Sequence, residues 1–293
     1  MKFKKVVVCG VGLIGGSFAL ALKQAGVAGE IVGLGRRPEA LAEALERGVI
    51  DRAAGDWAEA LTGAELVMLA VPVGQMPALL TAMAPHLAAS TLVTDAGSTK
   101  SDVVAAARAA LGTRSACFIP GHPIAGAEKS GVDAATADLF RGKRVVLTPL
   151  EENAPGAVEH IAALWAACGA EVSRLTPEAH DRIFAAVSHL PHVLAFALVH
   201  EFAGRAEADL LFGFAAGGFR DFTRIAGSSP EMWRDICLAN RPALLAELDA
   251  YMVELMRTRV LLAGADAEGL LALFTAARQR REAWLQSQPA VNE

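Results

Sequence analysis

The sequence has few aromatic residues and no excess of positive charge. Aromatic side chains make up 6% of its 293 residues, and 27 basic against 32 acidic side chains give a net charge of −5. Binding to nucleic acid or to an anionic membrane surface relies on basic patches or on stacking aromatic rings. We therefore expect neither a nucleic acid nor a membrane as a partner.

Cysteine is scarce too, and its spacing is not that of a metal site. Cys9, Cys117, Cys168 and Cys237 lie far apart in the chain, with no CxxC pair and no neighbouring histidine at zinc-ligand spacing. Each stands among apolar residues, so we expect reduced, buried thiols in a cytoplasmic protein and no bound metal.

Long uninterrupted apolar runs are missing as well. The uncharged stretch 66–94 is divided by Pro72, Pro77 and Pro85 into pieces shorter than the roughly 20 residues of a membrane span. The basic start of the chain, followed by the uncharged run 6–22, is similar to an export signal. Glycines interrupt that run, however, and their pattern is better explained by nucleotide binding.

Apolar residues are abundant, at 53% of the chain, and they form alternating strand and helix patterns. This alternation is typical of a doubly wound sheet. The expected strands are 5–9, 30–34, 66–70, 91–94, 116–120, 145–148 and 171–174, and the expected helices are 17–25, 74–83, 101–111 and 154–168. We predict an α/β, Rossmann-like fold with a mainly parallel sheet, which forms a dinucleotide-binding domain over residues 1–175.

The strand pattern ends at Thr176-Pro177, a sequence typical of a helix start. Helical patterns follow over 178–200, 241–264 and 267–285, with a glycine-rich loop near 213–218. These helices are too apolar to be fully solvated. We therefore predict an all-α domain over residues 176–293 that binds substrate and forms a homodimer.

The first turn of the chain carries a GxGxxG motif, Gly10-Val-Gly12-Leu13-Ile14-Gly15, between a predicted strand and a predicted helix. In this setting Gly10 allows the tight turn, Gly12 leaves room for a pyrophosphate and Gly15 allows close packing of helix on strand. We predict a dinucleotide held by this turn, with Leu13 and Ile14 at the start of the helix.

The end of the second strand bears on the choice of cofactor. An NAD-binding unit usually has an acid at this position, which binds the ribose 2′-hydroxyl. Here the residues are Gly35, Arg36 and Arg37. Two guanidinium groups in place of an acid favour a 2′-phosphate, so we predict NADP as the preferred cofactor, with NAD also possible. The alternative is a pair of solvated arginines before the next helix.

Three turns follow predicted strands at the edge where such sheets bind ligands, namely Val71-Pro72, Gly97-Ser98 and Gly121-His122. A histidine in such a turn is a candidate general base, because its ordinary pKa of about 6.5 leaves it mostly neutral at pH 7. His122 has the alternative of capping a backbone group. Ser98 has the alternative of a helix N-cap, which is compatible with a catalytic role.

The helical half contains a cluster of histidines, His180, His189 and His192, together with Arg224. A metal site is disfavoured because Pro191 falls between the histidines and no carboxylate has ligand spacing. An anion site that binds a carboxylated substrate fits these side chains better. For His189 a satisfied core histidine remains the alternative.

Taken together, these motifs resemble the prephenate/arogenate dehydrogenase family of tyrosine biosynthesis over nearly the whole chain. The resemblance is carried by the GxGxxG turn, Asp95-Ala-Gly-Ser-Thr-Lys100, Gly121-His-Pro-Ile-Ala-Gly126 with Glu128-Lys-Ser-Gly131, Ser188-His-Leu-Pro-His192 and Phe219-Arg-Asp-Phe-Thr-Arg-Ile-Ala226. It implies oxidative decarboxylation of prephenate, arogenate or both, with hydride transfer to NAD(P).

The resemblance also implies roles for single residues. His122 would take the proton of the substrate's ring hydroxyl, Ser98 would position it, and Arg224 would bind a substrate carboxylate. Three further residues would gate the site or hold the side-chain end of the substrate, namely Glu128, His180 and His192, and Trp233 would form a wall of that pocket.

Two other functions stay open from the sequence alone. A β-hydroxyacid-type dehydrogenase shares this layout, but such enzymes use a lysine in the helical domain and the segment 176–200 has none. A non-catalytic, NADP-sensing dimer is disfavoured by His122, which follows a strand at the predicted nicotinamide end.

Overall fold

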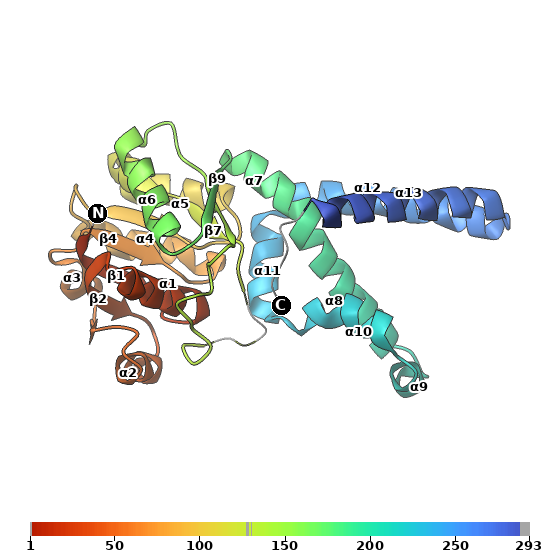
Figure 1. Ribbon diagram of the computed structural model, residues 1–293, viewed down its shortest axis with the longest axis horizontal. Helices are drawn as coiled ribbons and strands as arrows, with labels where there is room; N and C mark the ends of the chain where they lie inside the picture. The colour runs from red at the N-terminus through yellow and green to blue at the C-terminus, as the bar shows by residue number, and fades with distance from the viewer. Residues whose placement is uncertain (1, 127–128, 130, 288–293) are drawn as a thin grey trace. The chain divides into compact units, whose positions relative to one another are not determined.

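The computed structural model describes residues 2–126, 129 and 131–287 (Figure 1). The chain divides into two compact units, residues 1–244 and residues 245–293. The first unit contains every strand of the described residues and the helices up to α11. The second contains most of one long helix and all of another.

A six-stranded sheet lies at the centre of the first unit, and every neighbouring pair of its strands is parallel. In spatial order its strands are β3 (Arg52–Ala53), β2 (Ala28–Leu34), β1 (Phe3–Cys9), β4 (Leu66–Leu69), β5 (Leu92–Asp95) and β6 (Phe118–Ile119). The prediction of a parallel, Rossmann-like sheet is confirmed.

Helices cover both faces of this sheet, because successive side chains of a strand point to opposite faces. Along β1, Val6 and Val8 belong to one core cluster with Phe18 of α1 and Trp165 of α6, whereas Val7 belongs to a second cluster that includes α4 and α5. The helices of this half are α1 (Leu13–Gln24), α2 (Pro38–Glu46), α3 (Trp57–Leu61), α4 (Met76–Met83), α5 (Ser101–Leu111) and α6 (Pro155–Ala167), with 3₁₀ turns η1 (Val73–Gln75), η2 (Ala84–His86) and η3 (Gly112–Cys117).

The last strands of this half do not continue the parallel series, contrary to expectation. β7 (Gly121–Pro123), β8 (Arg144–Leu147) and β9 (Glu171–Arg174) form a separate three-stranded sheet, in which β7 is antiparallel to β8. His122 therefore lies in a strand and not in a turn. Pairing with β8 holds its backbone on an element of a sheet, which is a firmer support than a loop.

The helical part that follows the strands confirms the expected all-α second half. Its elements in the first unit are α7 (Pro177–Phe184), the π turn η4 (Ala185–His189), α8 (Leu190–Ala203), α9 (Ala208–Gly213), α10 (Gly217–Thr223), the 3₁₀ turn η5 (Arg224–Gly227) and α11 (Pro230–Ala239). The predicted glycine-rich loop ends early, since α10 begins at Gly217. No helix is expected from the sequence at α11, whose Trp233 and Ile236 belong to the core of the sheet region.

The segment from α7 to α8 forms one nearly continuous helix, Pro177–Ala203 (Figure 1). A π turn widens it just where the ring of Pro191 would otherwise meet the carbonyl of the preceding turn. Among the described residues this helix alone is long and apolar enough to span a membrane by length and composition, a test that core helices also pass. It carries Asp181 and three of the histidines described below.

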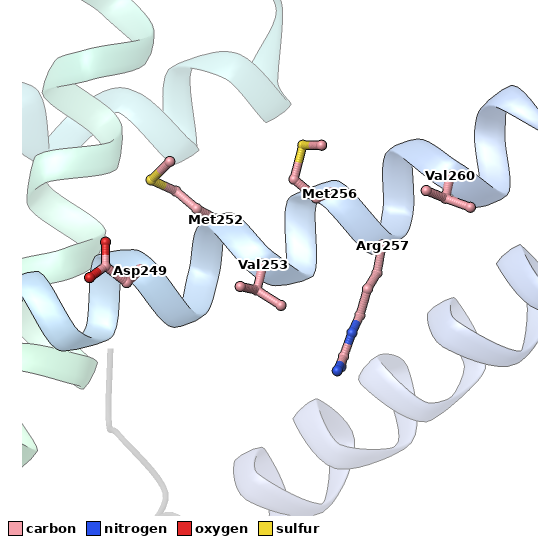
Figure 2. Close-up of a pocket in the computed structure, with 6 residues that line it drawn as sticks. All are labelled: Asp249, Met252, Val253, Met256, Arg257 and Val260. Atoms are coloured by element: carbon pink, nitrogen blue, oxygen red, sulfur yellow. The ribbon is translucent and has the colours of Figure 1, made fainter.

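The second unit consists of α12 (Arg241–Ala263) from residue 245 onward and of α13 (Ala267–Gln286). Large apolar side chains of this unit are exposed, among them Met252, Met256, Val260 and Phe274, each with more than half of its surface accessible. Met252, Val253, Met256 and Val260 line an open apolar pocket of about 550 Å³ along α12 (Figure 2).

Candidate active site

The carboxyl ends of β4, β5 and β6 meet at one edge of the sheet, because these strands are neighbours and parallel. The three expected turns therefore converge there. Val71-Pro72 follows β4, Ser98 lies in the segment after β5, and Gly121 follows β6 by two residues. The turn after β1 lies at the same edge, since β1 is paired with both β2 and β4.

The glycine turn after β1 has the geometry of a phosphate-binding loop. Gly10 has a φ of +91°, and a Cβ there would stand 2.3 Å from the carbonyl oxygen of Ala70. A Cβ on Gly15 would stand 2.1 Å from the carbonyl oxygen of Gly10, so α1 can pack this closely only without a side chain. At Gly12 a Cβ would meet nothing within 4 Å, which leaves open space before the first N–H groups of α1, at Leu13 and Ile14. These residues fit a dinucleotide.

Gly35, Arg36 and Arg37 are exposed between the end of β2 and the start of α2. Neither guanidinium forms an ion pair or hydrogen bond with a residue in the described part of the chain. A Cβ on Gly35 would touch only Leu41, at 3.7 Å, so steric crowding does not account for the missing acid.

A buried ion pair anchors the strand that carries His122. The side chains of Lys100 and Asp95 are fully buried and joined to each other. Lys100 Nζ also donates to the carbonyl of Gly121 at 2.7 Å, and Asp95 Oδ1 accepts from the N–H of Gly121 at 3.0 Å. Both backbone groups of the residue before His122 are thus held by one pair of charges. A pair so buried is costly to desolvate and is stable only when its hydrogen bonds are complete.

His122 contacts a second histidine. Its Nδ1 lies 2.8 Å from Nε2 of His180, and the side chain of Phe184 packs against both rings. Nδ1 of His180 lies 2.9 Å from Oδ1 of Asp181. Burial, together with the nearby His180 ring and Lys100 ammonium, holds the pKa of His122 well below its ordinary value.

The third histidine of the cluster, His189, lies in the π turn and is almost completely buried. Its Nδ1 accepts a hydrogen bond from the Asn240 amide at 3.1 Å, and its ring also hydrogen-bonds the backbone of Ser98. Burial lowers the pKa of His189 to about 4, which leaves the ring neutral at pH 7. Ser98, which is partly buried, is thereby placed beside the histidine cluster.

His192 and Trp233 form a stacked pair, with ring centroids 3.6 Å apart and planes inclined by 19°. Nδ1 of His192 donates to the carbonyl of Ser188 at 2.8 Å. Burial lowers the pKa of His192, and the charge of Arg224 lowers it further. His189 and Trp233 are also in edge-on contact, at 6.0 Å between centroids.

The structure thus brings together most of the residues expected from the sequence. His122 and His180 are in contact, and His189, Trp233 and His192 form a second group that extends to the charge of Arg224. Glu128 lies outside the described residues. The sequence reasoning missed Asp95, Lys100, Asp181, Phe184 and Asn240, although Asp95 and Lys100 are the ends of a motif that it quoted and Asp181 follows His180 directly.

Two family models match the chain in succession. Residues 18–174 match the prephenate dehydrogenase nucleotide-binding domain, and residues 176–276 match the prephenate dehydrogenase dimerization domain. A prephenate dehydrogenase of Bacillus subtilis is 39% identical over 94% of this chain and 75% of its own length. A cyclohexadienyl dehydrogenase of Zymomonas mobilis is 37% identical over 95% of both chains.

A solved structure is similar over its full length. The crystal structure of prephenate dehydrogenase from A. aeolicus, in complex with hydroxyphenyl propionate and NAD⁺, has a TM-score of 0.91 and 36% sequence identity. The match covers 97% of this chain and 99% of that one.

Proposed function

Because the chain belongs to the prephenate dehydrogenase family and is an NAD(P)-dependent oxidoreductase of tyrosine biosynthesis, we propose how its own residues divide the reaction between them. His122 is the general base, the residues around Arg224 bind the carboxylated substrate, and the glycine turn binds the cofactor. The β-hydroxyacid dehydrogenase and the non-catalytic sensor are excluded by this family assignment.

The contact between His122 and His180 supports the role of His122. Since Nδ1 of His122 faces Nε2 of His180, its own Nε2 is the nitrogen left for a substrate. The lowered pKa keeps this ring neutral at pH 7, as a base must be before it accepts a proton. Nε2 takes the proton of the ring hydroxyl as C4 is oxidised, and the phenol oxygen regains a proton once loss of CO₂ has made the ring aromatic.

The cofactor is held by the turn of Gly10, Gly12 and Gly15, by the start of α1 at Leu13 and Ile14, and by Val71, Pro72 and Ser98 at the ends of β4 and β5. When bound, its nicotinamide supplies the acceptor for the hydride that leaves the substrate. NADP is the preferred form, and this is supported by the two exposed guanidinium groups of Arg36 and Arg37 beside Gly35, where an acid would repel a 2′-phosphate.

The substrate is bound through its carboxylates and its ring. Arg224 attracts a carboxylate, and the stacked pair of His192 and Trp233 forms an apolar wall with its edge toward His189. The role of Glu128 in gating the site is supported only by the family resemblance. The substrate class is the cyclohexadienols prephenate and arogenate, which differ in a side-chain keto or ammonium group.

The active form is a homodimer made through the helical half, with the domain boundary between residues 175 and 176. This is supported by the match to a dimerization domain and by the apolar side chains exposed along α12. The reaction takes place in the cytoplasm, which the four free cysteines support.

Two single variants test the division between chemistry and binding. His122→Ala is expected to lower kcat by about 10²–10⁴ with unchanged KM for the cofactor, the usual contribution of a general base. Arg224→Ala is expected mainly to raise KM for prephenate or arogenate, because the lost carboxylate contact stabilises the bound substrate and the transition state equally. Steady-state kinetics that follow the reduced nicotinamide separate the two effects.

The results that would contradict these roles are distinct. An active His122→Ala enzyme removes His122 from the chemistry. A normal KM in Arg224→Ala removes Arg224 from substrate binding but leaves the role of His122 intact.

A further inference from the structure

Three side chains form a line from the middle of α7 to β7. Asp181 Oδ1 is 2.9 Å from Nδ1 of His180, and Nε2 of His180 is 2.8 Å from Nδ1 of His122. The ring of His180 has no accessible surface, so it lies behind His122 and not in contact with the substrate.

Asp181 is fixed as a hydrogen-bond acceptor. Its Oδ1 accepts the backbone N–H of Lys100 and its Oδ2 the backbone N–H of Ser101, each at 2.8 Å. These groups form the N-terminus of α5, where the helix dipole favours a negative charge. Burial by itself would raise the pKa of Asp181, and the hydrogen bonds from His180 and Ser101 outweigh it, so the net pKa is lowered. The carboxylate is therefore ionised and can only accept.

This acceptor determines where the protons of both rings lie. A neutral histidine has one N–H and one lone pair. Nδ1 of His180 must carry its proton in order to donate to Asp181, which leaves a lone pair on its Nε2. Nδ1 of His122 must then carry the other proton, and the lone pair of His122 is on Nε2, the nitrogen that a general base needs.

We propose that Asp181 and His180 are positioning residues that set the tautomer of His122 and stabilise the positive charge it gains when it takes the substrate proton. The inference rests on the proposed role of His122 as the base. The step breaks the O–H bond of the substrate and forms an N–H bond at Nε2 of His122, while the protons on Nδ1 of His122 and Nδ1 of His180 stay where they are. The hydrogen bond from Nδ1 of His122 to His180 strengthens as the ring becomes an imidazolium.

The surroundings keep this line of groups in register. The amide of Asn240 donates to the backbone carbonyl of Asp181 at 2.7 Å, and the ring of Phe184 lies 4.5 Å from His180 and 5.0 Å from His122, centroid to centroid. The Lys100 side chain and backbone reach both ends, since Nζ binds the Gly121 carbonyl and its N–H binds Asp181. These contacts restrict the ring of His122 to one orientation, which lowers the entropy cost of reaching the reactive geometry.

Substitutions at His180 test the proposal, first in the enzyme that has His122 and then in the His122→Ala variant. His180→Phe keeps a planar ring but has no acceptor for Nδ1 of His122, and we expect kcat to fall about 10²–10³-fold with the KM for the cofactor unchanged. His180→Gln offers an amide oxygen in place of Nε2 and is expected to recover at least about ten-fold of that loss. His160→Gln, an exposed histidine on α6, is the matched control and should match the wild type.

The same substitution is then made in the His122→Ala background. If His180 acts through His122, adding His180→Phe to His122→Ala causes no further loss of kcat, because the ring that His180 positions is absent. A merely structural role would lower activity by the same factor in both backgrounds and would lower the thermal midpoint to match. If His180→Phe does not fold, His180→Asn replaces it, since its shorter amide leaves Nδ1 of His122 without an acceptor.

The two proposals fail in different ways. A fully active His122→Ala enzyme overturns the role of His122, and the relay with it. A defective His122→Ala enzyme together with normal turnover in His180→Phe, or with additive losses in the double variant, overturns the relay alone.

Discussion

At the scale of single residues, the charge of the side chains after β2, rather than the space around them, bears on which cofactor is preferred. The position after β2 has room for an acid, since a Cβ on Gly35 would touch only Leu41 at 3.7 Å. Its neighbours Arg36 and Arg37 are exposed and can turn toward a bound ribose. An arginine that binds a phosphate contributes a charge-assisted hydrogen bond of about 1.5–3 kcal/mol, which is worth roughly a factor of ten to a hundred in affinity.

The proposed preference for NADP can be tested at these three positions. We expect a higher kcat/KM with NADP⁺ than with NAD⁺, and a loss of about ten-fold or more of this preference in Arg36→Ala or Arg37→Ala. Gly35→Asp should shift the preference toward NAD⁺, because its carboxylate repels a 2′-phosphate and accepts from a ribose hydroxyl. Kinetics with both cofactors measure this. Arg47→Ala, at the end of α2, is the control, and an unchanged ratio in the Arg36 and Arg37 variants would rule the assignment out.

At the scale of elements, α12 is unusual in leaving a run of large apolar side chains exposed, with the charged Asp249 and Arg257 among them. Tyr251, Met252, Val253, Leu255 and Met256 are consecutive or nearly so, and each is at least a third exposed. Of all its residues, only Leu244 is buried within one chain. So much exposed apolar surface normally has a cover, and the match to a dimerization domain supports a second copy of the chain as that cover.

A charge on α12 should therefore change the assembly. Met256→Glu places a carboxylate in the apolar pocket of Figure 2 and is expected to convert a dimer, of twice 30.5 kDa, largely to single chains. Light scattering after size exclusion measures the mass. Leu45→Glu, on an exposed position of α2, is the control and should leave the mass unchanged. A Met256→Glu protein that keeps the dimer mass would place the interface elsewhere.

At the scale of the whole molecule, buried neutral histidines make the fold sensitive to acid. Burial lowers the pKa of His122, His180 and His189, the last to about 4. In the unfolded chain each titrates near 6.5. Between these values the unfolded state binds a proton that the folded state does not, so stability is complete above about pH 6.5 and is lost as the pH falls.

The thermal midpoint should record this loss. We expect it to be constant above about pH 7 and to fall steadily between about pH 6.5 and 4, with each histidine contributing up to about 1.4 kcal/mol per pH unit. His189→Asn should flatten the slope, whereas the exposed His200→Gln should not change it. A midpoint that stays level from pH 7 to pH 5 would contradict neutral burial of these rings. Differential scanning calorimetry across this range makes the measurement.

The sequence by itself determined the parallel sheet, the glycine turn and the helical second half. These follow from local chemistry, because β-branched runs, the GxGxxG spacing from Gly10 to Gly15, and Pro177 at the start of a helix are recognised without any distant partner. Boundaries such as 101–111 and 171–174 were predicted as the structure has them, and each lies close to a glycine with positive φ, Gly112 after the helix and Gly169 before the strand.

Only the tertiary structure decided which side chains meet. β7, β8 and β9 form a separate sheet and do not extend the parallel one, and β7 is antiparallel to β8, with Gly121 paired to Leu147. No local sequence pattern predicts this pairing. From the sequence, Asp95 is a residue at a strand end and Lys100 a loop residue. In the structure they form a buried ion pair that hydrogen-bonds Gly121. His180 stood in the sequence beside Asp181 and 58 residues from His122, and packing of α7 against β7 made the three a single hydrogen-bonded line. Contacts between distant segments arise from the packing of whole faces, and such packing is a property of the folded chain rather than of any short stretch of it.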